Sequence, residues 1–310
     1  MLSSTLGACV SLLSFATSVL AVPVQLSRRE ISNELFQDFR YFAQVAAVAN
    51  SDKNIVNGTG KQLTCNKDPC ELVQADDTEI VSIYHGTAQA SGLIALDHTR
   101  KLILVTFRGT VTVPDLYQDI RIPLFTDVSD LCDGCKAHPG FWQYWLSVKD
   151  VVTSELRRIT KENPSYSVAV TGYSLGAAVA TVAGTALRAD GFTLDVWTFG
   201  APKVGNVKLA EFITQQHQPV SVYRATHNKD LIPAIPFIAP GLDYAHSSPE
   251  YWIDQPSFET VVPEVVKVIE GINNTSGNAG QRGRTIINEH QWYFGDMFIY
   301  GIPADFGYLL

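Results

Sequence analysis

The stretch VAVTGYSLGAAVAT, residues 168–181, decides the fold because two different patterns meet in it at one serine. Its first half is an apolar run of strand length, and its second half has the small residues typical of a buried helix. Ser174 lies at the junction, with Gly172 and Gly176 two positions away on either side. Side chains at those two positions would collide in a turn that joins a strand directly to a helix, which accounts for the glycines. We therefore predict a strand, a sharp turn at Ser174, and a helix.

A serine at this turn has the surroundings of a nucleophile. The first N–H groups of a helix lack intrahelical acceptors, and the helix dipole favours negative charge beside them. The pattern Gly-x-Ser-x-Gly between a strand and a helix is the nucleophile elbow, in which the N–H of the next residue, here Leu175, stabilises the oxyanion of acyl transfer. The alternative is a packing serine between two glycines. The nucleophile hypothesis requires a base and an orienting carboxylate elsewhere in the chain.

The chain contains candidates for both groups. In folds built on this elbow the order is serine, then acid, then histidine. Asp195 opens a strand pattern, whereas Asp230 follows one at its carboxyl end, so we predict Asp230 as the acid. Sequence order disfavours two of the four later histidines, His217 and His227. Two more follow the acid, His246 and His290, and spacing alone does not choose between them.

The rest of the chain alternates strand and helix patterns. Helical spacing covers residues 32–50, 139–161, 175–190 and 204–216, and apolar runs of strand length cover residues 79–85, 91–97, 101–107, 166–171, 194–199 and 219–226. Apolar strands that alternate with helices indicate a mostly parallel sheet with helices on both faces, and we predict one α/β domain over residues 30–310. Ligand sites in such sheets lie off the carboxyl ends of the strands, which is where Ser174 falls.

The amino-terminal segment has the features of an exported protein. The first 24 residues contain no charged side chain and include Val19-Leu20-Ala21, which predicts a signal peptide over residues 1–21; a membrane anchor is the alternative. Arg28 and Arg29 predict a second cut that removes residues 22–29 as a propeptide, and two ordinary surface arginines are the alternative. The 310-residue chain carries a formal charge of −8, and this acidic balance gives no sign of the basic surface that binds nucleic acid.

The cysteines also suit an oxidising compartment. Once Cys9 leaves with the signal peptide, four remain in two close pairs, Cys65 with Cys70 and Cys132 with Cys135. We predict local disulfides within each pair. A Cys-x-x-Cys pair can also serve redox chemistry or bind zinc, but the chain has no second such pair. Asn57, Asn273 and Asn274 match the acceptor pattern for N-linked glycans, so we also predict a glycoprotein.

A second oxyanion donor is expected from the loop after an earlier strand. The run LVTFRGTVTV, residues 104–113, ends such a strand with Gly109 and Thr110. Thr110 could offer both its N–H and its hydroxyl to an oxyanion. An ordinary turn threonine is an equally good interpretation of this spacing.

Together these motifs resemble the filamentous-fungal, class 3 lipases of the α/β-hydrolase fold, the group of the Thermomyces and Rhizomucor lipases. The resemblance covers nearly the whole chain after residue 29 and is carried by EISNELFQDFRYFAQVAAVAN, FRGT, CDGCKAHPGFW, GYSLGAAVA, FGAPKVGN, DLIPAIP, AHSSPEYW and HQWYFG. It implies a triad of Ser174, Asp230 and His290, an oxyanion hole of Thr110 and Leu175, and disulfides Cys65–Cys70 and Cys132–Cys135. It also implies that His246 is a supporting residue.

Two departures from the family pattern stand out. Tyr173 replaces the histidine that usually precedes the nucleophile, and we expect its side chain to face inward beneath the elbow and to change packing more than chemistry. The chain also lacks the cysteines of the disulfide that joins the two ends of the Thermomyces lipase. We therefore expect less constrained termini.

The family resemblance assigns residues 111–122 to a helical lid. Val113, Leu116 and Tyr117 would form one apolar stripe on a short helix, with Pro114 in its first turn. Moving that stripe from the active site to a lipid surface would make a two-state switch. A short turn packed permanently on the core is the alternative. Further apolar lining could come from four residues: Phe125, Phe237, Ile238 and Leu242.

The expected function is that of a secreted, monomeric serine hydrolase that cleaves acylglycerol esters at an oil–water interface. It would touch lipid surfaces transiently, and the sequence indicates no cofactor, metal or nucleic-acid partner. An esterase for ferulate or other soluble esters is the main alternative, and the apolar stripe of the expected lid favours lipid over it. A non-catalytic binding protein on the same scaffold is the third hypothesis, and the ordered presence of serine, acid and base disfavours it.

Overall fold

The computed structural model describes residues 30–65, 70–87, 90–109, 124–216, 221–237, 240–285 and 287–298. Its main sheet has eight strands in the order β1-β2-β3-β6-β7-β9-β11-β12. They span β1 Thr78–His85, β2 Ser91–Asp97, β3 Leu102–Phe107, β6 Ser167–Tyr173, β7 Leu194–Phe199, β9 Val222–His227, β11 Glu250–Ile253 and β12 Val266–Ile269. A smaller sheet joins β10 (Tyr244–Ala245), β8 (Gly205–Asn206), β5 (Lys136–Ala137) and β4 (Thr126–Asp127). The predicted signal peptide and propeptide lie outside the described residues.

The main sheet is parallel in its middle and antiparallel at both edges. Strands β3, β6, β7, β9 and β11 pair in parallel, whereas β1–β2, β2–β3 and β11–β12 pair antiparallel. The prediction of an α/β fold with a mostly parallel sheet is confirmed. Strands β11 and β12 were not predicted, because four-residue segments are too short for a clear period of two.

Among the described residues, the four longest helices follow the four predicted helical segments closely, and three shorter helices of five or six residues were not predicted. The helices are α1 Asn33–Val48, α2 Asp52–Asn57, α3 Glu71–Ala75, α5 Pro139–Glu162, α6 Leu175–Ala189, α7 Val207–Gln215 and α8 Ile287–Gln291, with 3-10 turns η1 Ile232–Ala234, η2 Pro263–Val265 and η3 Asn278–Gly280. Ser32 caps α1 by accepting a hydrogen bond from the N–H of Leu35, as its position ahead of the helical pattern indicates. Every helix within the described ranges is too short or too polar to cross a membrane.

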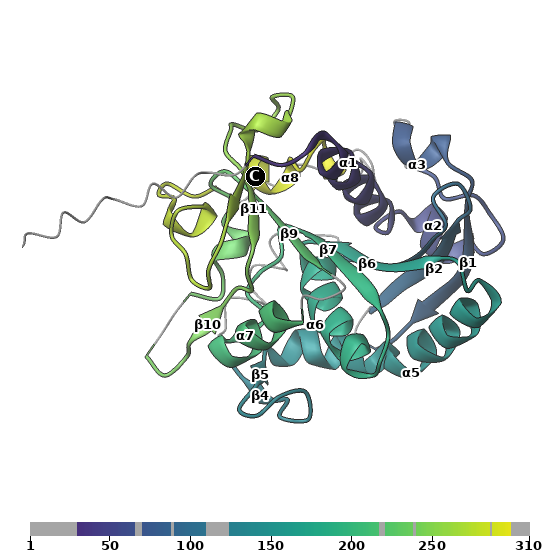
Figure 1. Ribbon diagram of the computed structural model, residues 1–310, viewed down its shortest axis with the longest axis horizontal. Helices are drawn as coiled ribbons and strands as arrows, with labels where there is room; N and C mark the ends of the chain where they lie inside the picture. The colour runs from purple at the N-terminus through teal and green to yellow at the C-terminus, as the bar shows by residue number, and fades with distance from the viewer. Residues whose placement is uncertain are drawn as a thin grey trace, which may run out of the picture.

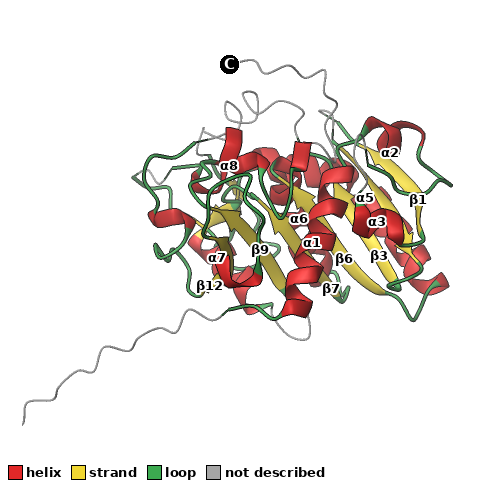
Figure 2. Cartoon of the chain, turned by 90° about the horizontal axis from the view of Figure 1, so that it is seen from above, coloured by secondary structure: helices red, strands yellow, loops and turns green. Residues whose placement is uncertain are grey.

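Alternate residues of β6 face opposite layers of the molecule. Val168 and Val170 belong to the apolar core that α5 and α6 cover, whereas Ala169 and Tyr173 belong to the core under α1. Figures 1 and 2 show the sheet between these two layers of helices, with α1 on one face and α5 and α6 on the other. This alternation places the side chain of Tyr173 on the α1 side, directly before Ser174.

The two predicted disulfides are present, Cys65–Cys70 and Cys132–Cys135. Their Cα atoms lie 5.7 and 5.3 Å apart, within the usual range for a disulfide. Each closes a short local loop.

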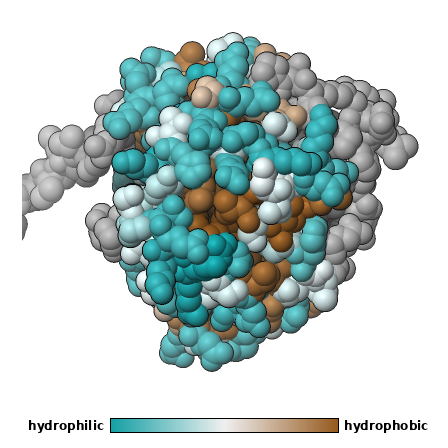
Figure 3. Space-filling model, turned by 90° about the vertical axis from the view of Figure 1, so that its right-hand side faces the viewer, coloured by the Kyte–Doolittle hydropathy of each residue, from teal (hydrophilic) through white to brown (hydrophobic). Residues whose placement is uncertain are grey.

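The sheet ends at β1 with a partly apolar face. Figure 3 views the molecule from this side and shows apolar surface among hydrophilic side chains. Exposed apolar residues of the neighbouring helices include Val56 beside β1 and both Leu146 and Val151 of α5. Strands β2 and β3 separate β1 from β6, so this surface lies away from Ser174.

Buried tyrosines predict that the fold loses stability in alkali. Burial, as the first cause, raises the pKa of Tyr84, Tyr173 and Tyr293 well above 10. The unfolded chain loses these protons near pH 10 while the folded chain keeps them, so the stabilisation is complete below pH 10 and is lost above it. Each of these tyrosines contributes about 1.4 kcal/mol per pH unit, so the three together should lower the free energy of unfolding by ~4 kcal/mol per unit above pH 10. The raised pKa values of four further tyrosines add to this slope: Tyr41, Tyr144, Tyr223 and Tyr244. Urea unfolding between pH 8 and 11 measures the slope. Tyr84→Phe should reduce it by about 1.4 kcal/mol per pH unit, and an unchanged slope would contradict the assignment.

Candidate active site

The sharp turn at Ser174 has the predicted position and shape. Ser174 follows β6 directly and precedes α6, with φ 60° and ψ −123°, in the region that residues other than glycine rarely adopt. Its N–H donates to the carbonyl of Phe199 on β7 at 2.9 Å, which holds the turn against the neighbouring strand. Surrounding structure therefore maintains a backbone strain of the kind that clusters at functional sites.

The two glycines of the motif make room for different neighbours. A Cβ on Gly172 would overlap the carbonyl of Gly176, which is the collision across the turn that the sequence predicted. A Cβ on Gly176 would instead overlap the carbonyl of Phe107 at the end of β3. Gly176 thus allows the turn at Ser174 to lie close to the end of β3. The local sequence does not predict this contact.

Ser174, His290 and Asp230 form one continuous line of hydrogen bonds. Nε2 of His290 lies 2.8 Å from Oγ of Ser174, and Nδ1 of His290 lies 2.8 Å from Oδ2 of Asp230. All three residues are buried, with Ser174 4% exposed and the other two fully enclosed. With a proton on Nδ1, the imidazole donates to the carboxylate and accepts from the serine hydroxyl. The structure therefore places His290 beside Ser174, and His246 beside the carbonyl of Pro233.

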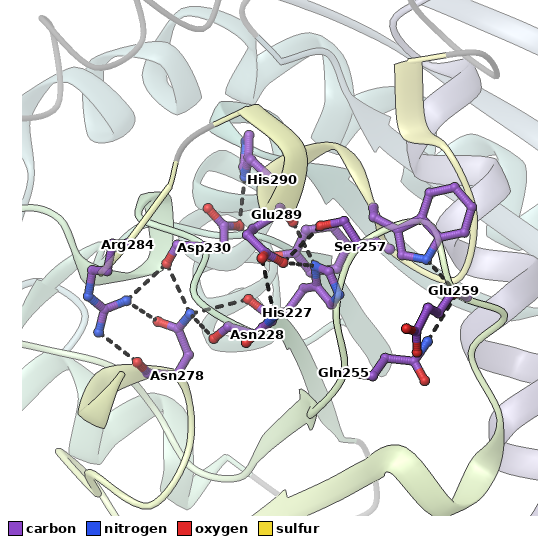
Figure 4. A network of polar contacts seen from close by, with 12 residues as sticks. His227, Asn228, Asp230, Gln255, Ser257, Glu259, Asn278, Arg284, Glu289 and His290 are labelled. Atoms are coloured by element: carbon purple, nitrogen blue, oxygen red, sulfur yellow. Dashed lines mark hydrogen bonds and ion pairs between the residues drawn. The ribbon is translucent and has the colours of Figure 1, made fainter. Parts of the chain in front are cut away.

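The carboxylate of Asp230 is fixed by further donors. Oδ1 accepts from the N–H of Ile232 at 2.9 Å, and Oδ2 accepts from the hydroxyl of Tyr293 at 2.5 Å. The backbone carbonyl of Asp230 accepts from Asn278 and from Arg284, both at 3.0 Å (Figure 4). The acid of the site is thus held by both its side chain and its main chain.

A second set of polar contacts holds the helix that carries His290. The carboxylate of Glu289 accepts from Asn228 at 3.1 Å and from Ser257 at 2.8 Å (Figure 4). Nδ1 of His227 lies 2.8 Å from the backbone carbonyl of Glu289. Burial is the largest cause that lowers the pKa of His227, which favours a neutral ring donating to that carbonyl. His227 therefore contacts the residue before His290 and has no described hydrogen bond to Ser174.

Two partly buried basic groups hold the segment after Asp230. Nε2 of His246 lies 2.7 Å from the carbonyl of Pro233, and Nζ of Lys203 donates to the carbonyls of Ala234 at 2.6 Å and Pro236 at 3.0 Å. Burial lowers the pKa of Lys203 to about 8. These contacts give His246 the supporting position that the resemblance implied. His217 lies outside the described residues.

The oxyanion side of the site is described in part. Leu175 is the first residue of α6, so its N–H has no intrahelical acceptor. The end of β3 is anchored beside the elbow, because the N–H of Gly109 donates to Oδ1 of Asn50 at 2.8 Å and Arg108 pairs with Asp52 at 2.8 Å. Thr110 and the lid residues Val113, Leu116 and Tyr117 lie outside the described residues.

The apolar residues expected to line the site have different surroundings. Phe237 is 51% exposed, whereas the ring of Phe125 stacks on Tyr244 with centroids 4.4 Å apart. Leu242 is partly buried, and Ile238 lies outside the described residues. Phe237 is therefore an exposed apolar side chain, whereas Phe125 packs against Tyr244.

Three residues contact this line of hydrogen bonds. The sequence analysis did not predict Gly200 or Tyr293, and it predicted only the inward direction of Tyr173. Gly200, with φ 65°, follows β7, and a Cβ there would lie 2.8 Å from Cε1 of His290. Tyr293 bonds the acid, and Tyr173 contacts the base from the strand before the nucleophile. The position of Gly200 at the carboxyl end of a strand was a usable signal. The partners of both tyrosines depend on the fold of distant segments.

Comparisons with known proteins agree with this geometry. Residues 104–239 match the family described as Lipase (class 3). The secreted mono- and diacylglycerol lipase A of Penicillium cyclopium is 35% identical over 91% of this chain and 94% of its own length. The secreted mono- and diacylglycerol lipase 1 of Fusarium solani is 36% identical over 88% of this chain and 79% of its own.

Solved structures extend the agreement to the whole fold. The crystal structure of mono- and diacylglycerol lipase from Aspergillus oryzae superimposes with a TM-score of 0.78 at 35% identity, covering 86% of this chain and 98% of the other. The Lip2 lipase of Yarrowia lipolytica gives a TM-score of 0.74 at 26% identity, covering 88% and 97%. On this agreement of sequence, fold and elbow, the chain belongs to the class 3 lipases, a family of carboxylic ester hydrolases.

Proposed function

We propose that this protein is a secreted lipase that hydrolyses acylglycerol esters through an acyl-enzyme on Ser174. His290 acts as the general base and acid, and Asp230 orients it. The observation that carries the proposal is the line of two 2.8 Å hydrogen bonds from Asp230 through His290 to Ser174. A buried serine, base and acid in this order are the parts that acyl transfer needs.

Acylation follows from the positions of these atoms. Oγ of Ser174 forms a bond to the ester carbonyl carbon while its proton passes to Nε2 of His290, and the carbonyl π electrons move to oxygen. We assign the stabilisation of this oxyanion to the N–H of Leu175 and to Thr110. The bond to the leaving alkoxy oxygen then breaks, and His290 returns the proton to that oxygen. The alcohol leaves, and the acyl group remains on Ser174.

Deacylation repeats these steps with water in place of serine. His290 takes a proton from water as its oxygen bonds to the acyl carbon, and then gives the proton to Oγ of Ser174 as the acyl bond breaks. The products are a carboxylic acid and free enzyme. Asp230, held by Ile232 and Tyr293, stabilises the imidazolium that forms in each half of the cycle.

The substrate class is proposed from the relatives and from the expected lid. Relatives at 35% and 36% identity are named as mono- and diacylglycerol lipases, so we assign this enzyme to partial glycerides. The apolar stripe expected at Val113, Leu116 and Tyr117 would contact the lipid surface and leave the site open. The half-exposed ring of Phe237 adds apolar surface of the kind that an acyl chain requires.

Export is proposed on three grounds. The same relatives are named as secreted proteins, the first 24 residues form the pattern of a signal peptide, and two disulfides suit an oxidising compartment. Two of the glycan acceptors, Asn57 and Asn273, are exposed, and exposure is required of a modified asparagine.

A panel of substrates tests the proposal. Emulsified monoacylglycerol, diacylglycerol and triacylglycerol, phospholipid vesicles and dissolved methyl ferulate are offered to the secreted enzyme, above and below the solubility limit of the glycerides. We expect partial glycerides to be hydrolysed fastest, with a rise in rate once an interface forms. Ser174→Ala supplies the background rate. A preference for methyl ferulate without any response to an interface would instead indicate a soluble-ester esterase.

Covalent labelling tests the chemistry separately from the substrate. An organophosphonate should add one phosphonyl group per molecule, and peptide mass spectrometry should locate it on Ser174. Failure to label the folded protein would revive the hypothesis of a non-catalytic binding protein.

A further inference from the structure

We propose that Tyr173 is a positioning residue that holds His290 in line with Ser174. The inference rests on the proposed function, because it assigns Tyr173 a part in the same acyl transfer. Tyr173 makes two separate contacts with His290. Its hydroxyl donates to the backbone carbonyl of His290 at 2.8 Å, and its ring stacks on the imidazole with centroids 4.9 Å apart and planes inclined by 26°.

These contacts join the nucleophile to the base through rigid structure. Tyr173 is the last residue of β6, which has a parallel neighbour on each side, and Ser174 follows it directly. His290 comes from α8, a helix of five residues, 116 positions further along the chain. A helix this short has little stability of its own, so its position depends on tertiary contacts. Tyr173 thus fixes the base against the same strand that carries the serine.

The other described contacts of α8 do not hold the backbone of His290 itself. His227, Asn228 and Ser257 form hydrogen bonds with Glu289, the residue before His290. Asp230 holds Nδ1 of the imidazole. Only the hydroxyl of Tyr173 has a described hydrogen bond to the carbonyl of His290 itself. The Tyr173 ring lies against one face of the imidazole, and the Tyr293 ring stands perpendicular to it at 6.3 Å.

The stacked ring also suits the charged form of the base. During acyl transfer the imidazole gains a proton, and the negative face of an aromatic ring within about 6 Å attracts a cation. The carboxylate of Asp230 faces the same imidazole from the loop after β9, so the cation lies between a carboxylate and a π face. This interaction strengthens when the proton arrives and therefore favours the transition state over the bound substrate. Losing it should lower kcat and leave KM unchanged.

Two variants separate the contributions of hydroxyl and ring. Tyr173→Phe keeps the stack and removes the hydrogen bond to the carbonyl, and we expect kcat on a soluble p-nitrophenyl ester to fall about fivefold. Tyr173→Leu removes both contacts, and we expect a fall of about 10² in kcat, the size of effect that a displacement of ~1 Å produces. KM should stay within about twofold in both. The rate of phosphonylation at Ser174 should fall in parallel with kcat.

Tyr84→Phe is the matched control. Tyr84 is also a fully buried tyrosine whose hydroxyl donates to a backbone carbonyl, that of Thr106 at 2.5 Å, but it comes from the edge strand β1. It should lose as much stability against urea as Tyr173→Phe and keep the kcat of the wild type. A higher kcat in Tyr173→Phe than in Tyr173→Leu would show that the stacked ring contributes to the rate.

The outcomes distinguish a positioning role from simple packing. If Tyr173→Phe loses stability as Tyr84→Phe does while its kcat and labelling rate stay unchanged, Tyr173 only fills the core and the inference is wrong. If Tyr173→Leu does not fold, Tyr173→Phe alone decides. A wild type that resists phosphonylation would instead contradict the proposed function, and a labelled wild type that rejects glycerides would contradict only its substrate.

Discussion

Ser174→Ala is expected to lower kcat by a factor of ~10⁴ to 10⁶ while the protein folds normally. The hydroxyl is the atom group that forms the acyl-enzyme, so no other described residue at the elbow can take its place. Its removal costs little stability, because the turn is held by the backbone bond from Ser174 to Phe199 and by the two glycines. Initial rates on a soluble ester, with urea unfolding in parallel, measure both quantities.

The control for this variant comes from the same strand. Ser167 opens β6 with an exposed side chain, at the end of the strand opposite to Ser174. Ser167→Ala should keep the rate of the wild type. If Ser174→Ala retains near-normal hydrolysis, the acyl-enzyme mechanism is wrong, whatever the substrate.

Asp230→Asn is the second change with a large expected effect, a fall in kcat of ~10⁴. The carboxylate accepts from Ile232 at one oxygen and from Tyr293 and His290 at the other. An asparagine has only one acceptor oxygen, so its NH₂ group must face either the N–H of Ile232 or the Nδ1 of His290. In the second arrangement the imidazole proton moves to Nε2. Nε2 can then no longer accept a hydrogen bond from the hydroxyl of Ser174. Either arrangement also removes the charge that stabilises the imidazolium.

Asp195→Asn provides a matched change of the same residue type. Asp195 is the acid that sequence order placed at the start of its strand, and its carboxylate accepts from the N–H of Ser221 at 2.8 Å, away from the triad. This variant should hydrolyse esters at the wild-type rate. A similar small loss for both variants would mean that Asp230 does not orient the base. Steady-state kinetics and near-UV circular dichroism compare the two variants.

The sequence predicted the strands and helices around Ser174 because the patterns that indicate them lie within short stretches of the chain. The elbow, the strands on either side of it and the long helix α5 each carry apolar periodicity and end signals within one short window. Strand direction also placed Ser174 and Asp230 at the same edge of the sheet, since the carboxyl ends of parallel strands meet there. The short strands β11 and β12 carry too few residues for any such signal.

By itself, the sequence determined the sharp turn at Ser174 between a strand and a helix and the position of Asp230 after the carboxyl end of a strand, because backbone sterics and strand direction act within each segment. The residues alone left His246 and His290 open, and only the tertiary structure brought one imidazole to Ser174 and left the other at the carbonyl of Pro233. The fold likewise decided that Tyr173 faces His290. Contacts between segments more than a hundred residues apart depend on how whole layers pack, and no local pattern encodes that packing.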